Sequence, residues 1–415
     1  MNNPLYQVRP IRDLKDMIIK STELYGEKTA FLIKRHDNTF TRIKYNEYKA
    51  DIDALGTAFV NIGLSGCKIA LLSENRYEWC TAYLSVVNGT GIIVPLDKEL
   101  PEPEIQNLIT MSGACALIFS GKHEASIKKI RGLLPGLIHL INIDAMEDSD
   151  GILSYTKLIQ KGYDLVNSGD RSFIDATVDN NVMNMLLYTS GTTGVAKGVM
   201  LSHTNICSDM MSVCSEIQIN EADSSLSILP VHHTYESTCD FLLMIYNGCT
   251  LSFNEGLKHI AKNLKETKPT IIFLVPLILE SMYKKIWDQA GKKFGMKTFL
   301  RFSVAFSDFL LNNLGIDIRK KLFRSIHENL GGRVRLVISG AAALNPDVSK
   351  GLRSFGIRVL QGYGMTECSP IISVNTDRIA NDSSVGPALS CMEVKIENPN
   401  KEGIGEIVVK GPNVM

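Results

Sequence analysis

The sequence contains no apolar run long enough to cross a bilayer. Its most apolar window, "TIIFLVPLILESMY" at residues 270–283, includes Pro276 and Glu280 and is shorter than the roughly 20 apolar residues that a spanning helix needs. The first residues, "MNNPLYQVRPIRDLKD", have no apolar core of signal-peptide length. We therefore expect neither a membrane span nor secretion.

The sequence also lacks an excess of either charge and lacks cysteines spaced as pairs. Lys plus Arg and Asp plus Glu both number 44, and this balance argues against a nucleic-acid-binding protein, which usually has a basic excess. The nine cysteines are odd in number and form no C-x-x-C pair, so a disulfide framework is not expected. We expect buried free thiols and a cytoplasmic location. Peripheral contact with the inner face of a membrane stays open, although no amphipathic basic helix stands out in the sequence.

Two kinds of catalytic centre lack their sequence pattern. The eight histidines are dispersed without the spacing of a zinc site. Ser190 lacks the G-x-S-x-G elbow of serine hydrolases. Cys368 follows an acidic residue of a motif described below, and we interpret it as a bystander. Neither zinc chemistry nor a serine nucleophile is expected.

Alternating strand-like and helix-like segments make up most of the chain. Apolar runs at residues 68–75, 91–97 and 115–121 alternate with helical stretches, and the alternation resumes after Asn184 and continues to residue 364. Strands that are apolar throughout are typical of parallel sheets covered on both faces. Near the C-terminal end, two strand-like runs flank "NPNKEG", which indicates a hairpin.

This pattern predicts an α/β fold with two parallel-type β-sheets flanked by helices, layered αβαβα. We expect a first α/β lobe over residues 1–180, a second over 181–370, and a small β-rich, barrel-like subdomain over 371–415.

A loop of small and hydroxylated residues follows one of the apolar strands, and we expect a helix to begin after it at about Ser202. The loop comprises Thr189, Ser190, Gly191, Thr192, Thr193, Gly194, Val195, Ala196 and Lys197. Residues this small let several backbone N–H groups converge on a polyphosphate, while the hydroxyls add donors and the lysine adds a cation.

Spacing excludes one reading of this loop. A Walker A loop needs glycine where Ala196 stands and a hydroxyl where Gly198 stands. A solvated surface loop is the alternative interpretation. The position after a strand, where open α/β sheets bind ligands, favours phosphate.

A second motif, "QGYGMTE", follows the strand-like run "IRVL". It comprises Gln361, Gly362, Tyr363, Gly364, Met365, Thr366 and Glu367. The tyrosine offers a flat ring for stacking on adenine, and the glycine after it permits a tight turn close to a nucleotide. The threonine can donate to an α-phosphate oxygen, and the glutamate suits Mg²⁺. Taken singly, these residues also fit a core ring and a surface carboxylate.

The two motifs, in this order, resemble those of the AMP-binding adenylate-forming superfamily, which includes acyl-CoA synthetases, luciferases and the adenylation domains of peptide synthetases. Ala196 departs from the proline usual there. The resemblance implies that residues 189–194 and Lys197 close over the β and γ phosphates of ATP. It also implies that Gly340, Ala341 and Ala342 of "SGAAAL" run beside adenine and the acyl pocket; a plain strand-to-helix turn is the alternative for the alanines.

A third segment concerns which carboxylic acid the protein would activate. "LPVHHTYE" at residues 229–236 resembles long-chain fatty acid-CoA ligases, with His233 in the family histidine position of the substrate pocket; a helix-start histidine is the alternative. "NRYEW" at residues 75–79 also resembles acyl-CoA synthetases. An amino-acid adenylation domain would need an acidic residue for the α-amino group, and Glu236 or Asp240 is available.

The resemblance implies a two-step reaction. A carboxylate, most simply that of a long-chain fatty acid, attacks the α-phosphate of Mg-ATP to give acyl-AMP and pyrophosphate, and coenzyme A then displaces AMP. Lys197, Thr366 and Glu367 are the expected catalytic residues, with Glu367 on Mg²⁺. Activation of an aryl or amino acid and a non-catalytic nucleotide-binding role are the alternatives.

The resemblance also implies a ribose-binding aspartate and a small C-terminal domain with the adenylation lysine, both expected beyond residue 415. We therefore expect residues 1–415 to be the large N-terminal domain, which binds nucleotide weakly and turns over slowly. Its expected partners are small molecules and that missing domain.

Overall fold

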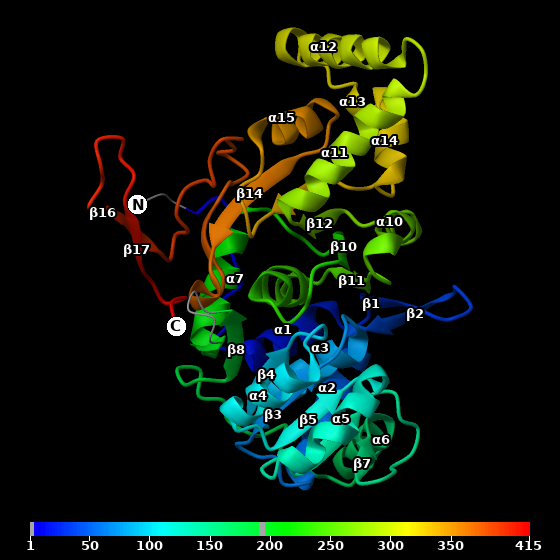
Figure 1. The fold of residues 1–415 in the computed structure, drawn as a ribbon, viewed down its shortest axis with the longest axis vertical. Helices are drawn as coiled ribbons and strands as arrows, with labels where there is room; N and C mark the ends of the chain where they lie inside the picture. The colour runs from blue at the N-terminus through cyan, green and yellow to red at the C-terminus, as the bar shows by residue number, and fades with distance from the viewer. Residues whose placement is uncertain (1–3, 191–195) are drawn as a thin grey trace.

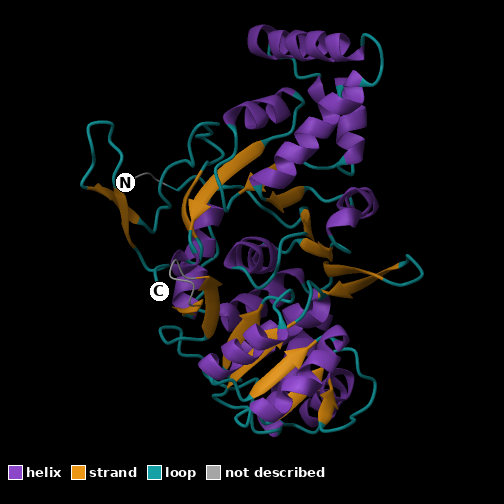
Figure 2. Ribbon diagram, in the orientation of Figure 1, coloured by secondary structure: helices purple, strands orange, loops and turns teal. Residues whose placement is uncertain are grey.

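The computed structural model describes residues 4–190 and 196–415 of the chain. Gly191, Thr192, Thr193 and Gly194 of the expected phosphate loop lie outside the described residues. Two large sheets with helices around them occupy most of the molecule, and a separate hairpin projects beside them (Figure 1, Figure 2).

The first large sheet has seven strands in the order β7-β6-β5-β3-β4-β8-β9. All neighbours are parallel except the edge pair β8 and β9. Its central strands are apolar on both faces, as a sheet covered by helices on both sides requires. The strands are β3 Lys68–Leu72, β4 Ile92–Leu96, β5 Ala116–Phe119, β6 His139–Asn142, β7 Ile152–Ser154, β8 Met185–Ser190 and β9 Ala196–Leu201.

The second large sheet has eight strands in the order β15-β14-β13-β12-β10-β11-β1-β2. Its two edge strands, β2 and β15, run antiparallel to their neighbours. The strands are β1 Thr29–Lys34, β2 Phe40–Lys44, β10 Ser224–Ser227, β11 Thr250–Phe253, β12 Ile271–Leu274, β13 Leu336–Ser339, β14 Val359–Gly364 and β15 Ile371–Val374.

Sheet membership does not follow the order of the chain. Strands β1 and β2, from the first 180 residues, join the second sheet, and β8 and β9, which follow residue 180, join the first. Strand β15, just past residue 370, also belongs to the second sheet. The expected C-terminal hairpin is present as β16 Glu393–Glu397 and β17 Glu406–Lys410, which pair antiparallel and are mostly exposed.

Helices fill the space between the sheets and cover their outer faces. The α-helices are α1 Leu14–Tyr25, α2 Tyr45–Asn61, α3 Tyr77–Val87, α4 Glu102–Ser112, α5 Glu124–Ile130, α6 Tyr155–Asn167, α7 His203–Glu216, α8 Thr234–Glu236, α9 Leu243–Tyr246, α10 Ile260–Thr267, α11 Pro276–Gly291, α12 Met296–Leu314, α13 Arg319–Leu322, α14 Arg324–Asn329 and α15 Pro346–Ser354. A π-helix, η3 Ser237–Leu242, joins α8 to α9, and four 3₁₀ turns are η1 Gly121–His123, η2 Arg131–Leu133, η4 Leu257–His259 and η5 Thr366–Cys368.

Three apolar clusters correspond to the layers. One lies between the first sheet and α4 and α5, and another between the second sheet and α10, α11 and α15. The largest lies between the sheets, where α3 packs on β3 and β4, α9 packs on β11, and α1 contacts both helices. The predicted αβαβα layering is therefore confirmed, with antiparallel strands at three sheet edges.

The nine cysteines are all free, and six of them are buried, as expected. Within residues 4–190 and 196–415, no helix is both long and apolar enough to span a bilayer.

Candidate active site

The two described ends of the phosphate-loop motif lie in paired strands. Thr189 of β8 pairs with Lys197 of β9, and the lysine side chain is exposed. The expectation that the loop leads directly from a strand into a helix is wrong, because the edge strand β9 comes between them. The helix itself begins where predicted, at His203, and the Ser202 hydroxyl accepts a hydrogen bond from the Asn205 N–H at its N-terminus.

The second motif ends strand β14 and forms the η5 turn. Gly364 lies opposite Ile371 of β15 at an irregularity in the pairing. A Cβ atom at Gly364 would lie 1.8 Å from the Pro370 carbonyl oxygen, so only glycine fits there. The Met365 N–H donates to the same oxygen at 2.8 Å. The turn therefore has one tightly fixed backbone path, which places Thr366 and Glu367 beyond the strand end.

The two motifs, some 170 residues apart in sequence, meet in space. Strand β9 packs against η5. Lys197 of β9 therefore belongs to an element that neighbours the turn containing Thr366 and Glu367.

Residues 411–415, here called the C-terminal clasp, hold this junction together. Asn413 is fully buried and its side-chain amide donates to the carbonyl oxygens of Cys368 at 3.0 Å and Ile371 at 2.9 Å. The Met415 N–H donates to the Glu367 carbonyl oxygen at 2.9 Å. On the other side, the Asn205 amide of α7 donates to the carbonyl oxygens of Pro412 and Val414, both at 2.8 Å. Sequence reasoning identified no role for these residues.

The "SGAAAL" segment leaves strand β13 in a constrained turn. Ala341 has a φ of +70°, a left-handed conformation that costs a non-glycine residue about 1 kcal/mol. The side-chain oxygen of Gln361 accepts a hydrogen bond from the Leu344 N–H at 2.5 Å, and its amide donates to the Ser384 carbonyl oxygen. The Gln361 side chain is therefore engaged in positioning the turn.

A cavity of about 250 Å³ opens between this turn, the end of β14 and α8. It brings together eight of the residues predicted from sequence: His233, Gly340, Ala341, Gly362, Tyr363, Gly364, Met365 and Thr366. The lining does not include Gln361, Ala342 or Glu367. The remaining wall consists of Leu229, Pro230, Thr234, Tyr235, Glu236, Val275, Pro370 and Ile371.

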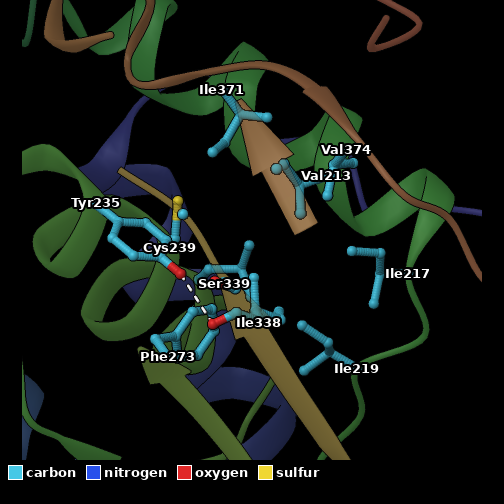
Figure 3. Close-up of a pocket in the computed structure, with 13 residues that line it drawn as sticks. Val213, Ile217, Ile219, Tyr235, Cys239, Phe273, Ile338, Ser339, Ile371 and Val374 are labelled. Carbon is cyan, nitrogen blue, oxygen red and sulfur yellow. Dashed lines mark hydrogen bonds between the residues drawn. The ribbon is translucent and has the colours of Figure 1, made fainter. Parts of the chain in front are cut away.

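A narrow apolar pocket lies next to this cavity, and Figure 3 shows the residues that line it. The two spaces share Tyr235, Gly340, Gly362 and Ile371 as walls. The rest of its lining is almost entirely apolar: Val213, Ile217, Ile219, Cys239, Leu243, Phe273, Ile338, Ser339 and Val374.

Tyr235 stands between the two spaces. Its hydroxyl donates to the Ile338 carbonyl oxygen at 3.0 Å (Figure 3), and a Cβ atom at Gly340 would touch its ring at 3.0 Å. Sequence reasoning did not single out this residue, although it fills the aromatic position of "HHTYE".

The histidine pair lies at the edge of the cavity. The rings of His232 and His233 are 4.1 Å apart. Burial lowers the pKa of His232 to about 4 and also lowers that of His233. The His232 Nε2 atom lies 3.7 Å from the Asp97 carboxylate, whose negative charge raises the pKa of the ring and opposes part of the effect of burial. Asn75 of "NRYEW" fixes this segment, because its amide donates to the Leu229 carbonyl oxygen at 2.6 Å.

Two acidic side chains lie beside the cavity, but in a buried environment. Asp240 is fully buried and Glu236 is 1% exposed. The hydroxyls of Ser227 and Ser225 donate to Glu236 at 2.6 Å and to Asp240 at 2.5 Å. Burial raises the pKa of Asp240 to about 7, and burial together with the neighbouring Asp240 raises the pKa of Glu236 well above its ordinary range. Burial therefore favours the neutral form of the Glu236 carboxyl.

The donors at η5 suit magnesium better than zinc. Among the described residues, no group of three or more His, Cys, Asp or Glu side chains could hold a metal ion. Mg²⁺ commonly takes one or two carboxylates and completes its shell with water and substrate phosphates. Glu367 supplies such a carboxylate beside the phosphate-loop strand. Cys368 is buried and its pKa is raised to about 11 by burial, so its thiol is unreactive.

The chain is similar to known ligases over nearly all of its length. Long-chain-fatty-acid–CoA ligase 6 of Mus musculus is 27% identical over 436 residues, which cover 97% of this chain and 61% of that protein. A long-chain-fatty-acid-CoA ligase from Archaeoglobus fulgidus has a similar structure, with a TM-score of 0.76 and 18% identity over 100% of this chain and 77% of that one. An anthranilate CoA ligase in complex with anthranoyl-AMP has a similar structure, with a TM-score of 0.74 and 20% identity. The match covers 99% of this chain and 70% of that one.

These structural similarities support the fold. The chain spans only 61% of the length of the mouse relative. The family model described as "AMP-binding enzyme" matches residues 20–415. The protein is therefore a member of the AMP-binding enzyme family.

Proposed function

We propose that this chain carries the nucleotide- and acid-binding site of an AMP-forming acid–thiol ligase. In this function, ATP activates a carboxylic acid as acyl-AMP, with release of pyrophosphate, and coenzyme A then takes the acyl group. The proposed acid is a long-chain fatty acid, as in the names of the curated relatives.

The adjacency of the two spaces carries the proposal. The cavity lined by Tyr363 and Thr366 shares Tyr235 and Gly340 as walls with a pocket of aliphatic and aromatic side chains. A nucleotide in the cavity would present its α-phosphate near Thr366, and an acid whose carboxylate meets that phosphate would extend its tail past Tyr235. The apolar pocket measures about 20 Å³, so the tyrosine ring would have to swing aside for an acyl chain to enter. Its hydroxyl gives up one or two backbone hydrogen bonds in doing so.

The chemical obstacle is the approach of one anion to another. Lys197 and the N–H groups of the phosphate loop would neutralise the β and γ phosphates, and the Thr366 hydroxyl would donate to the α-phosphate. Glu367 would hold Mg²⁺, which supplies Lewis-acid stabilisation of phosphate charge when bound. Tyr363 would orient adenine through its ring.

Activation of an amino acid is the second candidate. It would use Glu236 or Asp240 as the partner of an α-ammonium group. The raised pKa of both carboxyls argues against it, because a neutral acid gives an ammonium group little electrostatic attraction.

Pyrophosphate exchange by the full-length protein, which on this proposal includes residues beyond these 415, with a panel of fatty, aryl and amino acids tests the proposal. Long-chain fatty acids should support exchange best, and Glu236→Gln should leave it largely intact. Exchange driven best by amino acids and abolished in Glu236→Gln would favour the second candidate.

Nucleotide binding is measured separately, because we propose that residues completing the catalytic machinery lie outside these 415. Lys197→Ala and Glu367→Ala should each weaken Mg-ATP binding at least about ten-fold, measured by calorimetry. Lys401→Ala, an exposed lysine in the C-terminal hairpin, is the matched control. Binding that is indifferent to the first two substitutions would indicate a scaffold role.

A further inference from the structure

Helix α12 presents its aromatic side chains to solvent. Phe299, Phe302, Phe306 and Phe309 are between 46% and 68% exposed, and their spacing of three and four residues places them along one face of the helix. We call these four residues the phenylalanine stripe. Figure 1 shows α12 lying across one end of the molecule, outside the layers of the fold.

The inward face of the same helix mixes small polar side chains with Leu300 and Val304, which pack partly buried against the apolar cluster of the second sheet. Ser303 and Ser307 are the buried residues of α12, and Asp308 accepts a hydrogen bond from the Ser354 hydroxyl of α15 at 2.9 Å. A surface helix of a globular protein normally buries its apolar side. This helix buries part of Leu300 and Val304 but leaves four phenylalanines exposed on its other side, so the stripe is not explained by packing within the chain.

Basic side chains lie along α11, the residues that join it to α12, and the start of α12. Residues 280–308 contain six basic residues and three acidic ones, Glu280, Asp288 and Asp308, within a molecule of zero formal net charge. The basic residues, all exposed, are Lys284, Lys285, Lys292, Lys293, Lys297 and Arg301. No carboxylate among the described residues lies within ion-pair distance of any of them.

An apolar recess adjoins the stripe. A cavity of about 880 Å³ lies between α10, α11, α12 and α14, with Met296 and Leu300 of α12 in its wall. Lys285 and Lys293 also line it. Such a recess can accept an acyl tail whose anionic headgroup meets the lysines.

From these observations we propose that α12 and the loop before it form a docking surface for a membrane containing anionic lipid. Exposed aromatic side chains beside lysines and arginines are the pattern of helices that lie in a bilayer interface. A second copy of the chain is a poor occupant, because it would bring two positively charged faces together. The structure thus reveals the amphipathic basic helix that the sequence pattern did not indicate. The inference is independent of the proposed function.

Vesicle flotation tests the proposal. The chain should bind vesicles of phosphatidylcholine with about one third phosphatidylglycerol, and binding should weaken as salt is raised. Replacing the whole stripe by alanine (F299A, F302A, F306A and F309A) should reduce binding at least about ten-fold. Alanine favours helix and the side chains are exposed, so circular dichroism and thermal unfolding should stay unchanged.

Two further variants separate the contributions. Lys292→Glu, Lys293→Glu and Lys297→Glu together should abolish the preference for phosphatidylglycerol over pure phosphatidylcholine. Leu133→Ala, Ile138→Ala and Met146→Ala remove equally exposed apolar side chains from the first lobe and should leave binding unchanged. The proposal is overturned if the wild-type chain ignores anionic vesicles, if the stripe variant binds as well as wild type, or if the stripe variant turns a lipid-free dimer into a monomer.

Discussion

Gly364 is the residue at which the candidate site leaves least room for change. Because its Cβ would fall 1.8 Å from a backbone oxygen, Gly364→Ala must displace the turn that carries Thr366 and Glu367. We expect it to lower the free energy of unfolding by about 1–3 kcal/mol and to weaken Mg-ATP binding. Urea denaturation and calorimetry measure the two effects.

Gly362 provides the control, because its nearest neighbours would lie at an ordinary 3.4 Å from an added Cβ. Gly362→Ala should change the free energy of unfolding by less than about 0.5 kcal/mol. Equal destabilisation by the two substitutions would contradict the close-approach argument.

The buried carboxyl of Asp240 makes stability depend on pH. Its pKa rises from 3.8 to about 7 on folding, so below about pH 4 both states hold the proton. Between pH 4 and 7 the unfolded state releases that proton while the folded state keeps it. This group's contribution to stability therefore falls as pH rises, by up to about 4 kcal/mol, and levels off above pH 7.

Asp240→Asn should remove this dependence. The variant's free energy of unfolding, relative to wild type, should increase steadily from pH 4 to pH 7 in urea denaturation. The informative quantity is the difference in free energy of unfolding between variant and wild type, because other groups also titrate. Burial lowers the pKa of His203 to about 4, so its contribution to stability is lost in the opposite direction, as pH falls. A difference that stays constant over this range would show that Asp240 does not titrate as described.

At the scale of elements, helix α7 forms one wall of the apolar pocket through Val213, which lies across the pocket from Tyr235 (Figure 3). Val213→Phe would fill the space that an acyl tail should occupy. We expect it to weaken binding of a palmitoyl adenylate mimic at least about ten-fold, at about 0.8 kcal/mol per excluded methylene, and to spare an acetyl mimic. Calorimetry measures the affinity of the variant for the palmitoyl and acetyl mimics. Val182→Phe, at an exposed position, is the control. Equal effects on both mimics would place the tail elsewhere.

The position of the η5 turn depends in the same way on the C-terminal clasp. Asn413→Ala removes the donor to the carbonyl oxygens of Cys368 and Ile371. Loss of these buried hydrogen bonds should cost about 1–3 kcal/mol and loosen η5, so that thermal unfolding temperature and Mg-ATP affinity fall together. Asn312→Ala, on the exposed face of α12, should change neither. If Asn413→Ala lowers stability without affecting the nucleotide, the clasp does not position the site.

The sequence pattern predicted the strands in which nearly every residue is apolar and buried. The strands β3, β4 and β5 are apolar on both faces and appear where their runs predicted them. Strand β9 was missed because it alternates buried and exposed residues and begins with small ones, so it reads as a continuation of the loop. The hairpin β1 and β2 was not identified either. Its place beside β11, more than 200 residues away in sequence, depends on long-range pairing that no local pattern specifies.

The motifs identified residues that the fold brings together. Tyr363, Gly364 and Thr366 line one cavity, and their roles toward a nucleotide stay predictions. Tyr235 and Val213 had no distinguishing pattern, because an aromatic or β-branched residue on a buried helix usually serves the core. Their place in the wall of the apolar pocket becomes visible only once α7, α8 and β13 have packed together.

For the whole molecule, the site lies where the two sheets come together. Strands β8 and β9, which carry Thr189 and Lys197, belong to the first sheet, while the Tyr363 motif and the Gly340 turn end strands of the second. Neither sheet carries the complete site, and the layered arrangement brings its halves together. The central claim is that this junction binds an acyl-adenylate whose tail enters the apolar pocket.

The most direct test measures binding of acyl-sulfamoyl adenosines, non-hydrolysable mimics of acyl-AMP, to the 415-residue chain by calorimetry. The series runs from acetyl to palmitoyl and needs no turnover, so it does not depend on residues outside this chain. Affinity should rise with chain length by up to about 0.8 kcal/mol per methylene until the pocket is filled, and an aspartyl mimic should bind weakly. Equal affinity for acetyl and palmitoyl mimics, or tightest binding of the aspartyl mimic, would contradict the account.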